Sequence, residues 1–180
     1  MQTLLSEADR SAFERLLTDL SARFVNAAPA NVDAEITGAL RSLVEFLGVD
    51  RSNLFQWSAD GKILENTHQW VVEGCDPAPR FIAQETLPYA LGKILEGRIF
   101  SYSSAAELPT EAAVDRASMG KHMPKSHLLL PLTAAGSVRG ALTFGTVRHE
   151  GEWPGVLKER LAVATHDFAT VDAMRKRVIR

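Results

Sequence analysis

The segment 125–147 constrains the fold more than any other part of the chain. It consists of two apolar stretches, 125–133 and 137–147, which a three-residue turn at 134–136 separates. A short connection that contains glycine, between two stretches of strand length, is typical of a β-hairpin. The two stretches therefore predict neighbouring antiparallel strands.

A second hairpin is predicted earlier in the chain. Segment 52–58 is short, rich in large apolar residues, and followed by 59–62, whose Asp-Gly step favours a hairpin turn. The returning strand at 64–72 is expected to place His68 and Trp70 on one side. Together with a brief strand at 98–102, these segments predict an antiparallel sheet.

Helices are predicted at both ends of the chain. Apolar residues recur every three or four positions in 12–27, as on one face of an amphipathic helix. A second helix follows, with Asn31 as its N-cap and Gly48 as its stop. The last helix is expected to begin near Pro154, because proline suits a first helical turn.

The segment 103–124 has no sustained period and is mostly polar and alanine-rich. A short helix at 90–96 precedes it, and a helical stretch is expected near 110–119 inside it. Connections this long within a compact domain are usually functional or mobile. We therefore expect 103–124 to be the most mobile internal segment.

The length and composition indicate a single globular domain. The chain has 180 residues, of which 46% are hydrophobic and 23% charged. Helix, helix, hairpin, irregular segment, hairpin and helix describe an α+β domain with an antiparallel sheet of about five or six strands. We expect a flexible N-terminus at 1–11 and one domain at 12–177.

Charge and cysteine content exclude several classes of protein. The formal net charge of −2 and the pI near 6.2 do not favour nucleic acid or an anionic membrane. The longest apolar stretch, 128–135, is far shorter than the roughly 20 residues of a membrane span. Cys75 is the single cysteine, so no internal disulfide can form. With no secretory signal at the start, these features predict a cytoplasmic protein.

The order and spacing of several short strings are more specific than any string alone. The strand at 125–132 ends in Pro131-Leu132, Gly136 follows in the turn, and Gly140 begins the apolar part of the returning strand. The other strings are Val49-Asp50-Arg51 before the first strand, Leu87-Pro88-Tyr89 followed by Leu95-Glu96-Gly97, and Trp153-Pro154 before the last helix.

In this combination the chain resembles the GAF family of ligand-sensing domains, over roughly residues 12–177. It is similar to the GAF domains placed N-terminally in bacterial sensor histidine kinases and enhancer-binding transcription activators. The resemblance implies helices from both chain ends on one face of the sheet. A small-molecule pocket would lie on the other face, with 103–124 as its lid.

The resemblance implies a regulatory domain that binds a small-molecule signal and relays it to an output domain, a kinase or a transcription activator. Such a domain belongs to two-component signalling or transcription regulation. A ligand-free dimerisation spacer is the alternative. An enzyme with the GAF fold is a third possibility, which the single cysteine disfavours because the reductases of this fold need more than one. The ligand and any cofactor are left open.

The sequence offers little for catalysis or metal binding. His149-Glu150 begins like a zinc-protease motif but lacks the second histidine, and Gly151 favours a loop. His166-Asp167 resembles a phosphoacceptor motif, but the usual proline is replaced by Val171 and no phosphate-binding loop is present. We therefore predict neither an enzyme nor a metal site.

Cys75 is not expected to attach a bilin chromophore. In bilin-binding GAF domains the cysteine lies in or near a helix and commonly next to histidine, whereas Asp76 and two prolines follow Cys75. Seven residues are candidates for lining a ligand pocket: Phe55, Trp70, Tyr89, Tyr102, Met119, His127 and Leu129.

A parallel homodimer is predicted through the terminal helices. Apolar residues on both helices step by three and four, the spacing of a coiled-coil seam. The predicted interface residues are Phe13, Leu17, Leu161, Phe168 and Val171.

Overall fold

The computed structural model describes residues 7–178, with side chains through residue 171. Its centre is a five-stranded antiparallel sheet in the order β2-β1-β5-β4-β3. The strands are β1 (Arg51–Trp57), β2 (Leu64–Val71), β3 (Phe100–Tyr102), β4 (Ser126–Ala134) and β5 (Ser137–Thr146).

Both predicted hairpins are confirmed. β1 pairs with β2 and β4 pairs with β5, and β1 also pairs with β5, so the two hairpins form one sheet. The β4–β5 turn has positive φ at Ala135 (50°) and Gly136 (75°), the backbone of the reversed turns that match strand twist.

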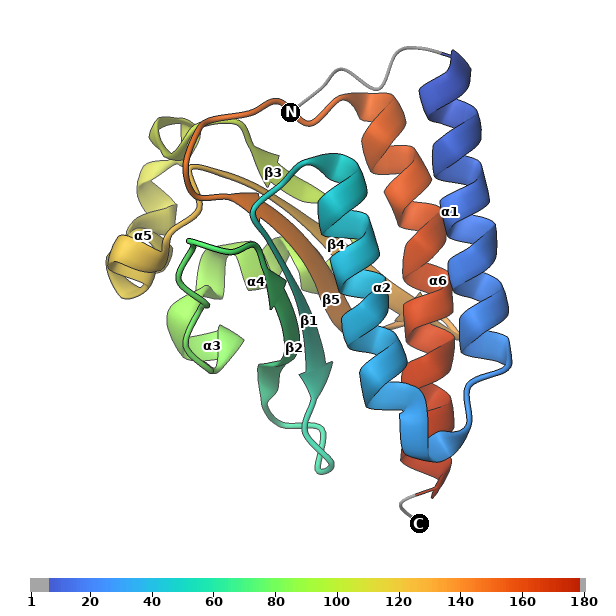
Figure 1. Ribbon diagram of the computed structural model, residues 1–180. Coiled ribbons are helices and arrows are strands. Elements are labelled where there is room, and N and C mark those ends of the chain that lie inside the picture. Colours follow the sequence, from blue (N-terminus) through green and yellow to red (C-terminus); the bar gives the residue numbers. More distant parts are fainter. Residues whose placement is uncertain (1–6, 179–180) are drawn as a thin grey trace.

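Three long helices cover one face of the sheet (Figure 1). They are α1 (Glu7–Val25), α2 (Val32–Leu47) and α6 (Gly155–Val178), with a short 3₁₀ turn, η1 (Pro29–Asn31), between the first two. Gly48 ends α2 as predicted, in the left-handed conformation, and its N–H donates to the carbonyl of Val44. α2 and α6 contact the sheet, and α1 packs against both helices.

The N-terminal prediction was wrong in part, because 7–11 belong to α1 instead of a flexible end. Glu7 and Asp9 lie in the first turn, where negative charge is favourable, but this signal precedes the apolar stripe that begins at Phe13. Residues 1–6 of the predicted flexible end lie outside the described residues.

The main core lies between these helices and the sheet. Alternate residues of the strands point to it, including Leu54, Leu128, Leu130, Leu142 and Phe144, and all five are buried. Strict alternation in the strands therefore leaves a different set of side chains on the opposite face.

The residues predicted to form a dimer seam pack inside a single chain instead. Phe13, Leu161, Phe168 and Val171 are each 1% exposed or less, and Leu17 packs on the same core. The ring of Phe168 contacts that of Phe24 edge-on at 5.1 Å between centroids, within one chain. The regular spacing is explained by packing of α1 and α6 on each other and on the sheet.

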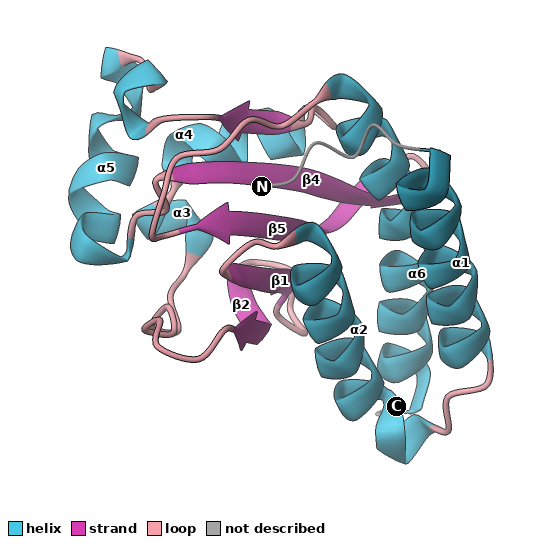
Figure 2. Ribbon diagram, turned by 45° about the horizontal axis from the view of Figure 1, so that its top comes forward, coloured by secondary structure: helices cyan, strands magenta, loops and turns pink. Residues whose placement is uncertain are grey.

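The opposite face is covered by short elements between β2 and β4 (Figure 2). The helices are α3 (Ala83–Thr86), α4 (Pro88–Leu95) and α5 (Ala113–Met119). The 3₁₀ turns are η2 (Ala105–Glu107), η3 (Thr110–Ala112) and η4 (Gly120–His122). The helical stretch expected near 110–119 is η3 followed by α5, whereas α3 was too short to predict.

None of the described helices is long and apolar enough to cross a membrane.

A substitution in the apolar stripe of α6 tests whether the stripe belongs to the core of one chain or to a dimer interface. Phe168→Glu places an unpaired charge in the core and should lower the free energy of unfolding by more than about 3 kcal/mol. Val163→Glu is the matched control, since Val163 is 66% exposed on the same helix and should change it by less than about 0.5 kcal/mol. Urea unfolding measures both; a folded Phe168→Glu chain of wild-type stability that only fails to dimerise would restore the seam.

Candidate ligand-binding site

Four residues lie directly opposite one another across four strands, on the face away from the long helices. Tyr102 of β3 pairs with His127 of β4, His127 with Gly145 of β5, and Gly145 with Arg51 of β1. Directly opposite residues project from the same face of a sheet. We call Tyr102, His127, Gly145 and Arg51 the polar row.

Arg51 is the unusual member of the polar row. It is 2% exposed, its Nη2 donates to the backbone carbonyl of His122 at 2.9 Å, and its Nε has no hydrogen-bond partner. Burial lowers the pKa of its guanidinium, but arginine stays charged in proteins. Among the described residues, no carboxylate lies within ion-pair distance of Arg51.

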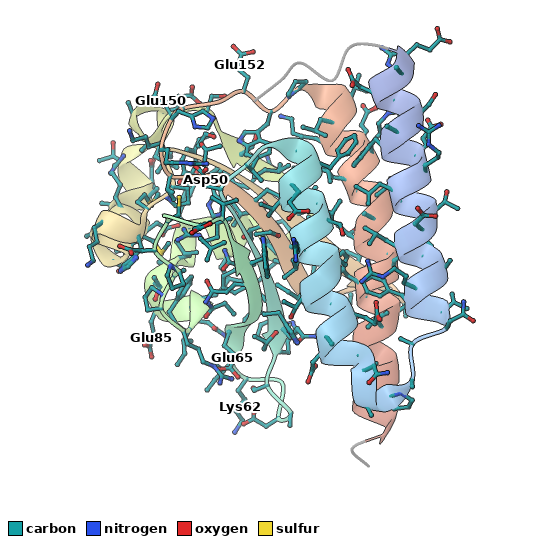
Figure 3. The ribbon with its side chains drawn as sticks, in the orientation of Figure 1. Asp50, Lys62, Glu65, Glu85, Glu150 and Glu152 are labelled. Atoms are coloured by element: carbon teal, nitrogen blue, oxygen red, sulfur yellow. The ribbon has the colours of Figure 1, made fainter. Side chains whose placement is uncertain are left out.

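Asp50, the preceding residue, is bonded elsewhere. Its carboxylate accepts hydrogen bonds from the backbone N–H groups of Val147 and Arg148 and from Nε of Arg148 at 2.7 Å. Burial alone would raise the pKa of Asp50, but these hydrogen bonds and the charge of Arg148 outweigh it and lower the pKa. Asp50 lies at the end of the sheet opposite the β1–β2 turn with Lys62 (Figure 3).

A second row, one step along the strands, is partly polar. It contains Asn53 of β1, Thr143 of β5, Leu129 of β4 and Phe100 of β3. The amide nitrogen of Asn53 donates to the Thr143 hydroxyl at 3.3 Å, while the amide oxygen is buried without a partner. Two neighbouring residues on one face of β1 thus have unused hydrogen-bonding atoms.

His127 and Tyr102 are neutral and buried. Burial, with the charge of Arg51 as the second cause, lowers the pKa of His127 to about 3. Burial also raises the pKa of Tyr102, whose hydroxyl donates to the carbonyl of Pro124 at 3.0 Å. Arg51 is therefore the one charged side chain of the polar row.

Gly145 makes room for the chain segment that covers the polar row. A Cβ at this position would lie 3.0 Å from Cβ of Pro124 and 3.1 Å from its Cγ. Pro124 therefore packs directly on the backbone of β5, and the carbonyls of His122 and Pro124 accept hydrogen bonds from Arg51 and Tyr102. We call 120–124 the covering segment.

A small apolar cavity lies farther along the same face. It has a volume of about 20 Å³, enough for roughly one water, and lies between the sheet and α4. Its wall includes Phe55, Leu129 and Ala141 from the sheet and Leu91 and Ile94 from α4. The face thus changes from polar to apolar along the strands.

Asp115 connects the covering elements to one another. It is 2% exposed on α5, and its carboxylate accepts hydrogen bonds from the backbone N–H groups of Tyr89 and Ala90 at the start of α4. A carboxylate at a helix N-terminus satisfies backbone donors and interacts favourably with the helix dipole. α4 and α5 are thereby fixed as one unit.

Six of the seven predicted pocket residues lie on this side of the sheet. Phe55 and Leu129 line the cavity, Met119 packs in the same apolar cluster, Tyr102 and His127 belong to the polar row, and Tyr89 packs edge-on against Phe100.

The prediction that Trp70 lines the pocket is wrong, because Trp70 lies on the other face of the sheet. It packs against the main core under Arg41 of α2, with the guanidinium carbon 5.1 Å from the ring centre. His68 is on the same side and bonds to Asp33 of α2 at 3.1 Å. The alternation expected for β2 is correct, but these residues point to the long helices.

Arg51, Asn53 and Thr143 were missed as site residues. The signal was present in the sequence, because Arg51, Asn53 and Phe55 alternate along a strand and must share a face. A strand whose inner face begins with arginine and asparagine and continues with phenylalanine indicates a buried polar site.

Within the described residues, no group of three or more His, Cys, Asp or Glu side chains comes together as a metal site would require. Glu150 accepts a hydrogen bond from Ser104, and His166 is exposed on α6. Cys75 lies half-buried in the loop after β2, where its N–H donates to the Val72 carbonyl.

No protein-family model matches the chain, and no curated protein sequence matches it. Solved structures do. The phycocyanobilin-bound GAF domain of a cyanobacterial phytochrome is 17% identical, with a TM-score of 0.72 over 91% of this chain and 94% of that one. The GAF domain of an Acinetobacter phosphoenolpyruvate-protein phosphotransferase is 13% identical, with a TM-score of 0.71 over 97% and 98%.

The cyanobacteriochrome TePixJ GAF domain is 13% identical, with a TM-score of 0.61 over 79% of this chain and 89% of that one. At these identities the likeness establishes the fold. The chain has the GAF fold, as the sequence predicted.

The neutral, buried His127 makes stability depend on pH. In the unfolded chain histidine titrates near pH 6.5, whereas in the fold it stays neutral to about pH 3. Its contribution is complete above about pH 6.5 and is lost as pH falls, by about 1.4 kcal/mol per unit. Urea unfolding at pH 7, 6 and 5 should show this slope.

His127→Gln removes the titrating ring, so its unfolding free energy should fall less steeply with acid. The exposed His166→Gln is the control and should keep the wild-type slope. The groups that face His127 are Arg51 and Tyr102, and neither changes charge between pH 5 and 7. An unchanged slope in His127→Gln would contradict the assignment.

Proposed function

We propose that the chain is a regulatory sensor domain that binds a small molecule on the sheet face with the polar row. The observation behind the proposal is Arg51, a buried charge with an unused Nε and no carboxylate partner in the described residues. An unpaired buried charge is costly for folding alone. Such groups are concentrated at functional sites.

Binding is favoured over catalysis by the composition of the polar row. It combines one charged arginine with a neutral histidine and a neutral tyrosine, and Nη2 of Arg51 and the Tyr102 hydroxyl donate to backbone carbonyls. A site of this kind can hold and orient a polar molecule. We therefore propose no enzymatic activity for the chain.

A path for relaying the signal runs from the start of 103–124 to α6. The N–H of Gly151 donates to the Ser103 carbonyl, and the Ser104 hydroxyl donates to Glu150 at 2.6 Å, which joins the start of 103–124 to the loop before α6. Lys158 of α6 also reaches the Ser101 hydroxyl at 3.3 Å. Movement at the start of 103–124 would therefore act on α6, and through it on a kinase or transcription-activator output domain.

Dimerisation through the terminal helices is part of the proposed relay. With the original stripe buried, an interface between two copies would have to use exposed apolar residues such as Val163 of α6 and Val25 of α1. The cytoplasmic location predicted from the sequence belongs to the same proposal.

A ligand-free spacer is the second candidate, and the size of the cavity favours it. A cavity of about 20 Å³ is far below the roughly 300 Å³ of an ordinary ligand site. The sensor proposal therefore requires the segment 103–124 to move when a ligand binds.

Amide exchange tests this requirement. The segment 103–124 contains only short helices and 3₁₀ turns, whereas 128–132 lies in β4, which pairs with β5 throughout this segment and with β3 at 128–129. Exchange should be at least about 100-fold faster in 103–124. Equally slow exchange in the two segments would favour the spacer.

One of the similar structures reported above is a phycocyanobilin-bound GAF domain, but we propose that Cys75 attaches no bilin. The loop at Cys75 has no neighbouring histidine in the sequence, and the described cavity has no room for a tetrapyrrole. Protein purified from bilin-producing cells and denatured should show no zinc-induced fluorescence. A fluorescent band that disappears in Cys75→Ala would overturn this.

A further inference from the structure

The free edge of Arg51 defines what kind of group it can bind. Nε and Nη2 form one edge of the guanidinium plane, with parallel N–H donors. In the structure this edge has a single neutral acceptor, the His122 carbonyl on Nη2, while Nε has none. A carboxylate has two oxygens at the spacing of this edge and binds it through two parallel hydrogen bonds.

The charge of the site points to a singly charged anion. Arg51 is the one charged group of the polar row, because His127 and Tyr102 are both neutral. The adjacent Asp50 is already bonded to Arg148. One carboxylate would neutralise Arg51, whereas a phosphate dianion would leave a buried negative charge without a partner.

The rest of the face indicates an apolar tail. Phe100 and Leu129 lie in the row beside the polar row, and Phe55 and Ala141 follow at the apolar cavity. A ligand with its carboxylate on Arg51 would place a short hydrocarbon tail along these side chains. The amide oxygen of Asn53, which has no hydrogen-bond partner, lies in the same row as Phe100 and Leu129.

We propose that the polar row binds the carboxylate of a small monocarboxylic acid through the Nε and Nη2 edge of Arg51, and that the carboxylate displaces the His122 carbonyl. This inference rests on the proposed sensor function. The covering segment acts as an internal substitute for the ligand in the ligand-free state. Binding therefore releases the segment from the sheet.

The backbone at the two ends of the covering segment allows the segment to move away from the sheet. Gly120 has φ 47° and ψ −123°, a backbone that favours glycine, and it stands at the junction of α5 and η4. Beyond Pro124 the chain is held to β5, since the Lys125 N–H donates to the Thr146 carbonyl at 2.7 Å. The segment between these points can move while α5 and β4 stay in place.

Butyrate and butyramide form a matched pair of probes, because they share size and tail and differ in charge. Butyrate should raise the Tm of the wild-type chain in a saturable manner, and butyramide at equal concentration should not. With butyrate bound, amide exchange in 120–124 should become faster while that in 128–132 is unchanged.

Two substitutions at Arg51 and one control complete the test. Arg51→Met should abolish the butyrate effect and, without ligand, should leave Tm unchanged or higher, because an unpaired buried charge is removed. Arg51→Lys keeps the charge without the two-donor edge and should raise the half-maximal butyrate concentration at least tenfold. Arg41→Met, on the opposite face, should respond like the wild type.

The outcomes separate this inference from the proposed function. If neutral compounds bind and alter exchange in 103–124 while butyrate does not, the sensor proposal stands and the carboxylate site is wrong. If phosphate or sulfate raises Tm through Arg51 and butyrate does not, the ligand class is also wrong. If no compound affects the wild-type chain or its exchange, both proposals fail.

Discussion

A positive charge held inside a sheet domain, without a negative partner in the described residues, is the constraint around which this structure is organised. Arg51 is fixed by the β1 register, which places it opposite Gly145, and by the bonding of Asp50 to Arg148, which removes the nearest carboxylate. The chain satisfies part of the guanidinium with a backbone carbonyl from the covering segment. A neutral carbonyl stabilises a buried charge less than an anion would.

The two faces of the sheet have different physical roles. One face is mainly apolar and packs against α2 and α6, so burial of hydrocarbon surface there supplies most of the stability. The other face has a polar end and an apolar end and is closed by short elements. Separating stability from recognition in this way allows the cover to move without loss of the main core.

The sequence was sufficient for the fold and insufficient for much of the site. Hairpins and helices depend on local turn chemistry and periodicity, which the β4–β5 turn and Gly48 show directly. The site depends on which strands are neighbours and which face the long helices cover. That information is not local, so Trp70 was placed on the wrong face. Arg51 was overlooked although its alternation with Asn53 and Phe55 is visible in the sequence.

The same limitation explains why the apolar stripe of α6 was assigned to a dimer seam. A stripe with steps of three and four on α6 fits either a partner helix or the helix's own sheet, and only the tertiary structure distinguishes them. Here Phe168 packs against Phe24 of the same chain. Periodicity identifies a buried surface but not what buries it.

The central claim concerns one edge of one guanidinium, and NMR observes it directly. The Nε–H resonance of Arg51 can be assigned by its absence from Arg51→Lys and followed during a butyrate titration. The account predicts a saturable downfield shift of this resonance, as expected for a new charge-assisted hydrogen bond, with no comparable shift for butyramide. An Arg51 resonance unmoved by saturating butyrate would contradict the account.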